Sequence, residues 1–186
     1  MKKNLLIMLF VLTLLLTGCS KPANNEIGGE ETEKSQKETI LSYENKQYRL
    51  KLDFPSTRNF KENVYGATVM FFAPEKKDKT TENLGITVKL IDSGANLETL
   101  YTDNKNMLKE IAEDFTIENE KSIKIDNYPA KQIQYSFSQG EYKIKQEQII
   151  VIKDEILYMI GYTATQDTFD DYKKEVNAII ESIRIR

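Results

Sequence analysis

The chain has 186 residues, with 26 basic and 29 acidic side chains and a formal net charge of −3, so it lacks the excess of Lys and Arg with which proteins bind nucleic acid. It has no histidine and a single cysteine, which excludes Ser-His-Asp and Cys-His nucleophiles, internal disulfides and the usual ligand sets of zinc. A domain of this size still buries about 68–70% of its unfolded surface, enough for a core without disulfides.

Residues 1–19 have the layout of a secretory signal. Two lysines at positions 2 and 3 precede an apolar run over residues 5–16. The run is shorter than the about 20 residues that a transmembrane helix needs, but it falls within the roughly 7–15 residues of a signal-peptide core. The small residues Thr17 and Gly18 follow, and Cys19 comes next. This order is typical of a secretory signal peptide followed by a small-residue cleavage site.

The four residues "LTGC", which end at Cys19, resemble the bacterial lipoprotein signal. The resemblance implies that residues 1–18 are a signal peptide, that cleavage falls between Gly18 and Cys19, and that the Cys19 thiol carries a diacylglyceryl group. Two acyl chains hold a protein stably at a membrane where one does not. We therefore expect a lipid anchor on the bacterial cell membrane, with the domain on its extracytoplasmic side. An ordinary signal peptide with an incidental cysteine is the alternative.

Residues 20–38 have the composition of a disordered tether behind the lipidated Cys19. They are rich in Glu, Lys, Asn and Gly, contain no aromatic residue and include Ile27 as their one β-branched aliphatic residue. A flexible segment of this length has an end-to-end distance of roughly 22–26 Å. The alternative is a structured N-terminal extension. We expect one folded domain over residues 39–186.

The first half of this domain has the pattern of strands. Apolar and polar residues alternate from Tyr48 to Phe54, and Pro55 ends the run, which predicts a half-buried strand. The segment before it, residues 39–43, would pair with it as a hairpin across a short turn. Residues 67–73 are apolar on both faces and predict a central strand, which residues 84–91 follow as another.

Helical spacing then begins at Asn96, a good N-cap, and continues to Phe115, with Asn104 as the one polar residue on the apolar face. After it, strands separated by short turns predict an antiparallel meander. A second helix closes the chain, with an apolar stripe from Phe169 to Ile183 and a capping box of Thr168 and Asp171. The meander strands lie within residues 122–126, 128–138, 141–153 and 156–165. The predicted fold class is α+β, a mostly antiparallel sheet sandwiched with two main helices.

The order of these elements resembles the PsbP-like (Mog/PsbP-type) fold, a family that includes bacterial lipoproteins. The similarity covers about residues 40–186 and rests on "YRLKLDFP", "ENLGITVKL", "IDNYPAKQIQYSF" and the terminal helix that follows "TAT". Two features of the family are missing: no Trp follows Pro55, and no histidine is present to take over the cation binding of photosynthetic members. The resemblance implies the fold and leaves a photosynthetic role doubtful.

Acidic residues are the remaining candidates for catalysis. General acid–base chemistry without His or Cys requires a carboxylate pair. The nearest clusters are Glu113 with Asp114 and Glu118 with Glu120. A cell-envelope hydrolase that uses such a pair is therefore the alternative function, although charges at helix ends and along strands are usually solvated. We predict no catalytic residue.

Asp167, Asp170 and Asp171 form the densest acidic cluster and are the leading candidates for an all-oxygen cation site. They lack the glycine and the spacing of an EF-hand loop, and at the start of a helix they complement its dipole. We expect no metal and no cofactor.

The predicted function is that of a membrane-anchored envelope lipoprotein whose non-catalytic accessory domain binds an envelope protein or a small ligand. Both helices are expected to cover the sheet, so contact residues should come from loops. The segment 56–66 carries Phe60 and Tyr65 among polar neighbours, and we predict these two as partner-binding residues. The charged segment 75–83 is the second choice, and packing of both rings onto the sheet is the alternative.

Overall fold

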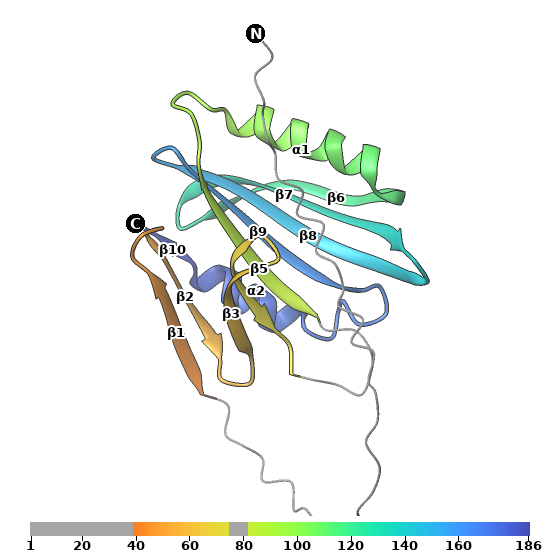
Figure 1. Cartoon of the computed structure of the whole chain (residues 1–186), viewed down its shortest axis with the longest axis horizontal. Coiled ribbons are helices and arrows are strands. Elements are labelled where there is room, and N and C mark those ends of the chain that lie inside the picture. The colour runs from red at the N-terminus through yellow and green to blue at the C-terminus, as the bar shows by residue number, and fades with distance from the viewer. Residues whose placement is uncertain (1–38, 75–81) are drawn as a thin grey trace, which may run out of the picture.

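The computed structural model describes residues 39–74 and 82–186, which form two antiparallel sheets and two helices (Figure 1). The first five strands are β1 (Ile40–Asn45), β2 (Leu50–Pro55), β3 (Asn59–Val64), β4 (Ala67–Phe72) and β5 (Asn83–Leu90). Helix α1 (Leu97–Ile111) precedes β6 (Glu113–Ile125), β7 (Tyr128–Gln139), β8 (Tyr142–Lys153) and β9 (Ile156–Thr165). The chain ends with α2 (Lys173–Ser182) and β10 (Arg184–Ile185).

The larger sheet has seven strands in the order β3-β4-β5-β9-β8-β7-β6, and the smaller one has the order β1-β2-β10. The predicted meander is confirmed as β6 to β9. Its tight turns at Asp126-Asn127 and Asp154-Glu155 place both residues of each turn at positive φ. Such turns match the twist of the strands that they join, and Asp and Asn tolerate this backbone conformation well.

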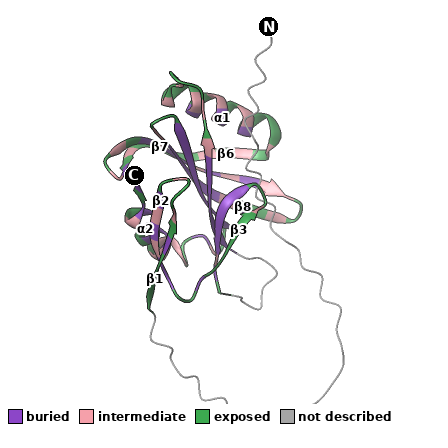
Figure 2. Ribbon diagram, turned by 60° about the vertical axis from the view of Figure 1, so that its left-hand side comes forward, coloured by how far each residue is buried: buried purple, intermediate pink, exposed green. Residues whose placement is uncertain are grey.

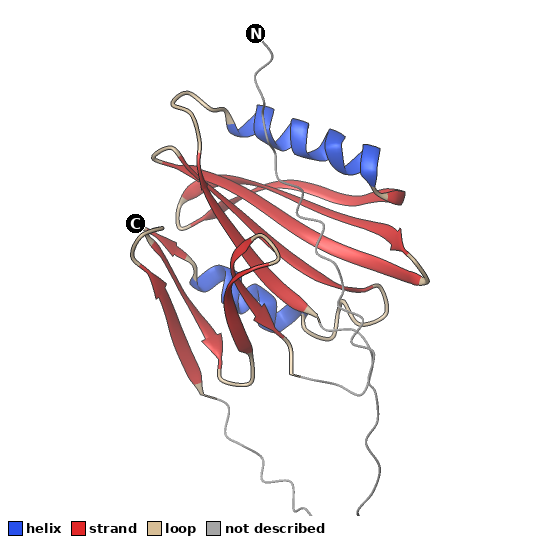
Figure 3. Ribbon diagram, in the orientation of Figure 1, coloured by secondary structure: helices blue, strands red, loops and turns tan. Residues whose placement is uncertain are grey.

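The two helices lie on opposite faces of the seven-stranded sheet (Figure 3). On one face, α2 and the smaller sheet cover a core that includes Val151, Ile160 and Tyr162. On the other face, α1 packs over β7 and β8, where Ile133 and Ile150 are buried. Buried residues follow the middle strands between these layers (Figure 2). The α+β prediction is therefore confirmed.

Helix α1 is shorter and β6 longer than predicted. Asn96 does cap α1, because its side chain accepts hydrogen bonds from the N–H groups of Glu98 and Thr99 at 2.9 and 3.2 Å. The helix ends at Ile111, and Asp114 takes a left-handed φ of 52° at the start of β6. Phe115 therefore lies in β6, where its ring packs 5.1 Å from that of Tyr135.

Helix α2 starts later than the predicted capping box. The Thr168 hydroxyl lies 2.8 Å from the Thr165 hydroxyl, in a turn that precedes the helix. The N-cap position is Tyr172, whose side chain makes no capping hydrogen bond. The helix begins at Lys173, so the capping-box prediction was wrong, while Phe169 still contributes to the core.

Several predictions concern residues outside the described parts of the chain. These are the signal peptide, the lipidation of Cys19, the tether over residues 20–38 and most of the charged segment 75–83. Within residues 39–74 and 82–186, neither helix has the length and apolar character needed to cross a membrane.

Candidate functional site

The predicted binding loop over residues 56–66 is mostly a strand. β3 (Asn59–Val64) forms one edge of the seven-stranded sheet, and β4 is its single strand partner among the described residues. Residues 59–63 are all exposed. Because neither face of β3 is fully buried, its sequence "NFKENV" lacks the alternation that predicts a strand.

Phe60 both packs against the domain and faces solvent. Its ring lies 5.5 Å from that of Tyr43, 5.6 Å from Phe54 and 5.8 Å from Phe71, and yet 44% of the residue is exposed. The Tyr43 hydroxyl donates a 2.5 Å hydrogen bond to Glu62, which ties β1 to β3. Burial, with this bond to Glu62, raises the pKa of Tyr43 to about 12. The aromatic cluster holds β3 in place and leaves Phe60 partly accessible to solvent.

Tyr65 stands in the turn that follows β3. It has a φ of 51°, and Gly66 has a φ of 79°, so the two residues form a hairpin turn in which both are left-handed. Gly, Asn and Asp suit these positions, whereas a bulky residue there is an outlier. Tyr65 is 49% exposed. A strained backbone thus presents an aromatic ring to solvent at the end of β3, and we call Phe60, Tyr65 and the open edge of β3 the β3 surface.

The opposite edge of the sheet is protected against pairing. β6 shows register shifts against β7 at two places, between Glu113 and Thr116 and between Ile117 and Asn119. Bulges and charged side chains both discourage the addition of another strand to an edge. β3 also carries exposed charges, Lys61 and Glu62, and Asn63 has a left-handed φ of 54°, but its pairing with β4 shows no register shift.

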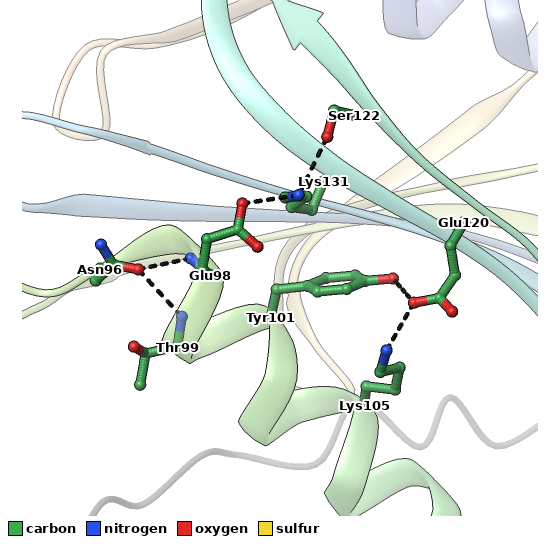
Figure 4. A network of polar contacts seen from close by, with 8 residues as sticks. All are labelled: Asn96, Glu98, Thr99, Tyr101, Lys105, Glu120, Ser122 and Lys131. Atoms are coloured by element: carbon green, nitrogen blue, oxygen red, sulfur yellow. Dashed lines mark hydrogen bonds and ion pairs between the residues drawn. The ribbon is translucent and has the colours of Figure 1, made fainter.

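The second bulge separates the carboxylates of the predicted pair Glu118 and Glu120. Glu118 lies 2.8 Å from the Lys145 Nζ, on the face of the sheet that α2 covers. Glu120 lies on the α1 face, 2.8 Å from Lys105 Nζ, and accepts a 2.5 Å hydrogen bond from the Tyr101 hydroxyl (Figure 4). The hydrogen bonds from Lys105 and Tyr101 hold the pKa of Glu120 below its usual value, whereas a general acid needs a raised one.

The other predicted pair is also engaged in surface contacts. Asp114 accepts hydrogen bonds from the Ser138 hydroxyl at 2.6 Å and from Lys143 Nζ at 2.9 Å. These two contacts lower the pKa of Asp114, in that order of importance. Glu113 is exposed on the same strand. Neither of the predicted pairs lies in a dry pocket.

The aspartates predicted to precede the second helix lie in the turns between β9 and α2. They are Asp167, Asp170 and Asp171, and they do not form a cluster of cation ligands. In residues 39–74 and 82–186, no three acidic, histidine or cysteine side chains come close enough together to hold a metal ion.

A groove of about 450 Å³ lies between α2 and the β6–β8 part of the sheet. Ile123, Ile149 and Ile180 are among its apolar lining residues. Where α2 begins, Lys173 Nζ lies 2.5 Å from the carboxylate of Glu147, a residue that is only 4% exposed. We call this feature the α2 groove. Sequence reasoning missed it, because the run "KQEQ" around Glu147 looks like an exposed part of a strand.

A protein-family model described as DcrB matches residues 60–182 of the chain. Among curated protein sequences, none matches this chain significantly. The match covers β3 through α2 and therefore includes both the β3 surface and the α2 groove.

Solved structures with the same fold include cyanobacterial PsbP from Synechocystis sp. PCC 6803, with 15% identity, a TM-score of 0.60, and coverage of 87% of this chain and 98% of that one. LpqN of Mycobacterium tuberculosis, described as involved in cell envelope biogenesis, has 11% identity, a TM-score of 0.60 and coverage of 81% and 86%. The Ran-binding protein Mog1p of Saccharomyces cerevisiae has 6% identity, a TM-score of 0.52 and coverage of 80% and 96%. The predicted PsbP-like fold is confirmed.

Proposed function

The chain belongs to the DcrB family, and from this premise we propose that it is a lipid-anchored accessory protein of the bacterial cell envelope that acts by binding a partner protein. The lipoprotein-type residues 16–19 support the anchor. The similarity of fold to LpqN, a protein described as involved in cell envelope biogenesis, supports the location. The engaged and separated carboxylates favour binding over hydrolysis.

The observation that carries the proposal is the strained, exposed Tyr65 at the end of an open sheet edge. Strain of this kind persists where the surrounding structure enforces it, and it is concentrated at functional sites. An open edge strand binds an extended segment of a partner through main-chain hydrogen bonds, and side-chain contacts add specificity. The partner would place such a segment along β3 and contact the rings of Phe60 and Tyr65.

Replacement of Tyr65 by Gly tests this role. Glycine adopts positive φ without strain, so Tyr65→Gly is expected to raise the free energy of unfolding by about 1 kcal/mol. The same change removes the exposed ring, so the amount of partner captured from native membranes should fall. Phe60→Ser should also reduce capture. If the Tyr65→Gly variant is more stable than the wild type and still captures less partner, the loss of binding cannot be due to unfolding.

Ile111→Ser is the matched control, because Ile111 is 45% exposed but lies at the end of α1, away from β3. It should capture the same partners as the wild-type chain. If Tyr65→Gly and Phe60→Ser both fold and retain every partner, the β3 surface is not the binding site. Turnover of a cell-wall or glycoside substrate by the purified wild type would contradict the binding function itself.

The anchor is tested with Cys19→Ala. Since the thiol is the acceptor of the lipid, this variant is expected to lose lipid labelling, lipoprotein-type cleavage and stable membrane association. Ser20→Ala, at the neighbouring position, is the control and should be labelled normally. Labelling of Cys19→Ala at the wild-type level would contradict the lipoprotein assignment.

A further inference from the structure

The α2 groove contains a buried amide without a protein partner. Gln132 of β7 lines the groove and is only 7% exposed, and its side chain makes no hydrogen bond to any residue that the structure describes. Burying a primary amide without a hydrogen bond costs free energy, and buried polar groups are therefore normally hydrogen-bonded. Because Gln132 lines the groove, a group bound there can supply the missing hydrogen bonds.

Lys121 stands beside Gln132 on the same face of the sheet. The two residues are directly opposite each other in the β6–β7 register, and such cross-strand neighbours have their Cβ atoms about 5 Å apart. The register continues to Ile149 of β8, which belongs to the core under α2. Lys121 is exposed, lines the groove and has no ion-pair partner within residues 39–74 and 82–186. A cation and an amide thus face the groove side by side.

The acidic residue on this part of the sheet is already neutralised. Glu147 is directly opposite Gln134, which is two residues from Gln132 on β7. The carboxylate of Glu147 lies 2.5 Å from the Nζ of Lys173, the first residue of α2. Lys121 is therefore the uncompensated charge at the end of the groove where α2 begins.

The other end of the groove, where α2 ends, carries charges of both signs. Asp126 lies there in the turn after β6, 3.8 Å from Arg184. Lys124 and Glu181 are exposed and have no ion-pair partner in the described parts of the chain. Lys124 leaves β6 on the opposite face from Lys121, because side chains alternate along a strand. The unpaired charges among the described lining residues are thus two positive and one negative, an excess that favours an anionic ligand.

From the adjacent Lys121 and Gln132 we infer that this end of the α2 groove binds a carboxylate group. One carboxylate oxygen accepts a hydrogen bond from Lys121 Nζ and the other accepts one from Gln132 Nε2. A single negative charge matches the single uncompensated cation. Asn177 lines the groove from α2, one turn after Lys173, and its amide can donate to and accept from a polar ligand body. Saccharide acids and peptides with a free C-terminus both carry a carboxylate on such a body.

The carboxylate site is separate from the β3 surface. The groove lies next to β6, and β6 and β3 form opposite edges of the large sheet. The groove can therefore bind its ligand whether or not β3 binds a partner, and the outcome for one surface does not decide the other.

Two matched pairs of probes test the site and distinguish its two sources of carboxylate. They are glucuronate with glucuronamide, and N-acetyl-dialanine with its C-terminal amide. Saturation-transfer difference NMR titrations use the full detergent-solubilised chain at low ionic strength. We expect the acid of at least one pair to bind about fivefold more tightly than its amide, and that pair identifies the source as saccharide or peptide. If neither acid binds more tightly than its amide, the inference is overturned.

Lys121→Met locates the charge that the carboxylate recognises. The variant should bind the acid and the amide of the preferred pair equally, because the uncompensated cation is gone. Lys124→Met is the matched control, since Lys124 is also an exposed lysine of β6 that lines the groove, but it lies on the other face of the strand. It should keep the preference for the acid. Loss of the preference in Lys124→Met to the same extent as in Lys121→Met would contradict the assigned position.

Gln132→Leu separates binding from folding. Leucine is close to glutamine in size but has no amide, so binding of the acid should weaken about fivefold. The melting temperature should stay at or above that of the wild type, because the variant no longer buries an amide without a partner. A purely structural role for Gln132 predicts the reverse, a lower melting temperature with unchanged binding, and that result would overturn the inference.

Discussion

Replacement of Lys173 by Met is expected to lower the free energy of unfolding by about 3 kcal/mol. Glu147 is 4% exposed, and its carboxylate lies 2.5 Å from Lys173 Nζ. Without the lysine, a buried carboxylate loses its partner, and breaking a buried pair in this way costs about 3–5 kcal/mol. We expect a loss at the lower end of this range, because the Lys173 side chain is 24% exposed and water therefore reaches the site. Urea unfolding of variant and wild type measures the difference.

The position of Lys173 strengthens this expectation. It occupies the first residue of α2, where the helix dipole disfavours a positive charge. A lysine at this point is unfavourable for the isolated helix, so its benefit to the domain must come from a contact outside the helix. The contact with Glu147 of β8 provides that benefit and joins α2 to the sheet.

Two further variants separate this mechanism from a general loss of packing. Glu147→Gln should lower the free energy of unfolding much less than Lys173→Met does. In the Glu147→Gln variant the Lys173 ammonium group loses its partner, but it is partly exposed and water can hydrate it. The double variant with Lys173→Met and Glu147→Gln should recover most of the loss. Lys143→Met is the matched control: its contact with Asp114 is exposed on both sides, and its removal should leave the stability unchanged. A double variant as unstable as Lys173→Met alone would contradict the mechanism.

The elements predicted correctly from the sequence are those whose signals are local. The meander β6–β9 has turn residues with a propensity for positive φ, such as Asp126 and Asn127, between strands with alternating apolar residues. Asn96 caps α1 through its own side chain, as its residue type predicts. Each of these features depends on neighbours within a few positions, so the sequence pattern is sufficient.

The elements that were missed depend on contacts between distant segments. β3 has no buried face of its own and gains its place from the cluster of Phe60 with Tyr43 and Phe71. The bulge that sends Glu118 and Glu120 to opposite faces leaves no mark in the spacing of the sequence. Glu147 is buried only because α2 returns over β8. No local sequence pattern contains this information. The α2 groove also forms between segments that are distant in the sequence, so no local pattern predicts it.

The second large effect is expected at Asn104, the one polar residue on the apolar face of α1. Asn104 and Gln148 are each 2% exposed, and the Asn104 Nδ2 donates a 2.5 Å hydrogen bond to the Gln148 Oε1. Asn104→Leu leaves the Gln148 amide buried without this donor, which should cost about 2 kcal/mol. Gln148→Met should cost a similar amount for the converse reason. Urea unfolding again measures both.

The double variant of Asn104→Leu with Gln148→Met decides whether the two side chains act as a unit. Replacing both partners of a buried hydrogen bond with apolar groups of similar shape is nearly neutral, so the double variant should be more stable than either single one. Tyr101→Phe, on the same helix, is the control. It removes a hydrogen bond to Glu120, an exposed carboxylate that water can solvate, and so it should cost less than about 1 kcal/mol. Additive losses in the double variant would mean that Asn104 stabilises α1 through contacts other than Gln148.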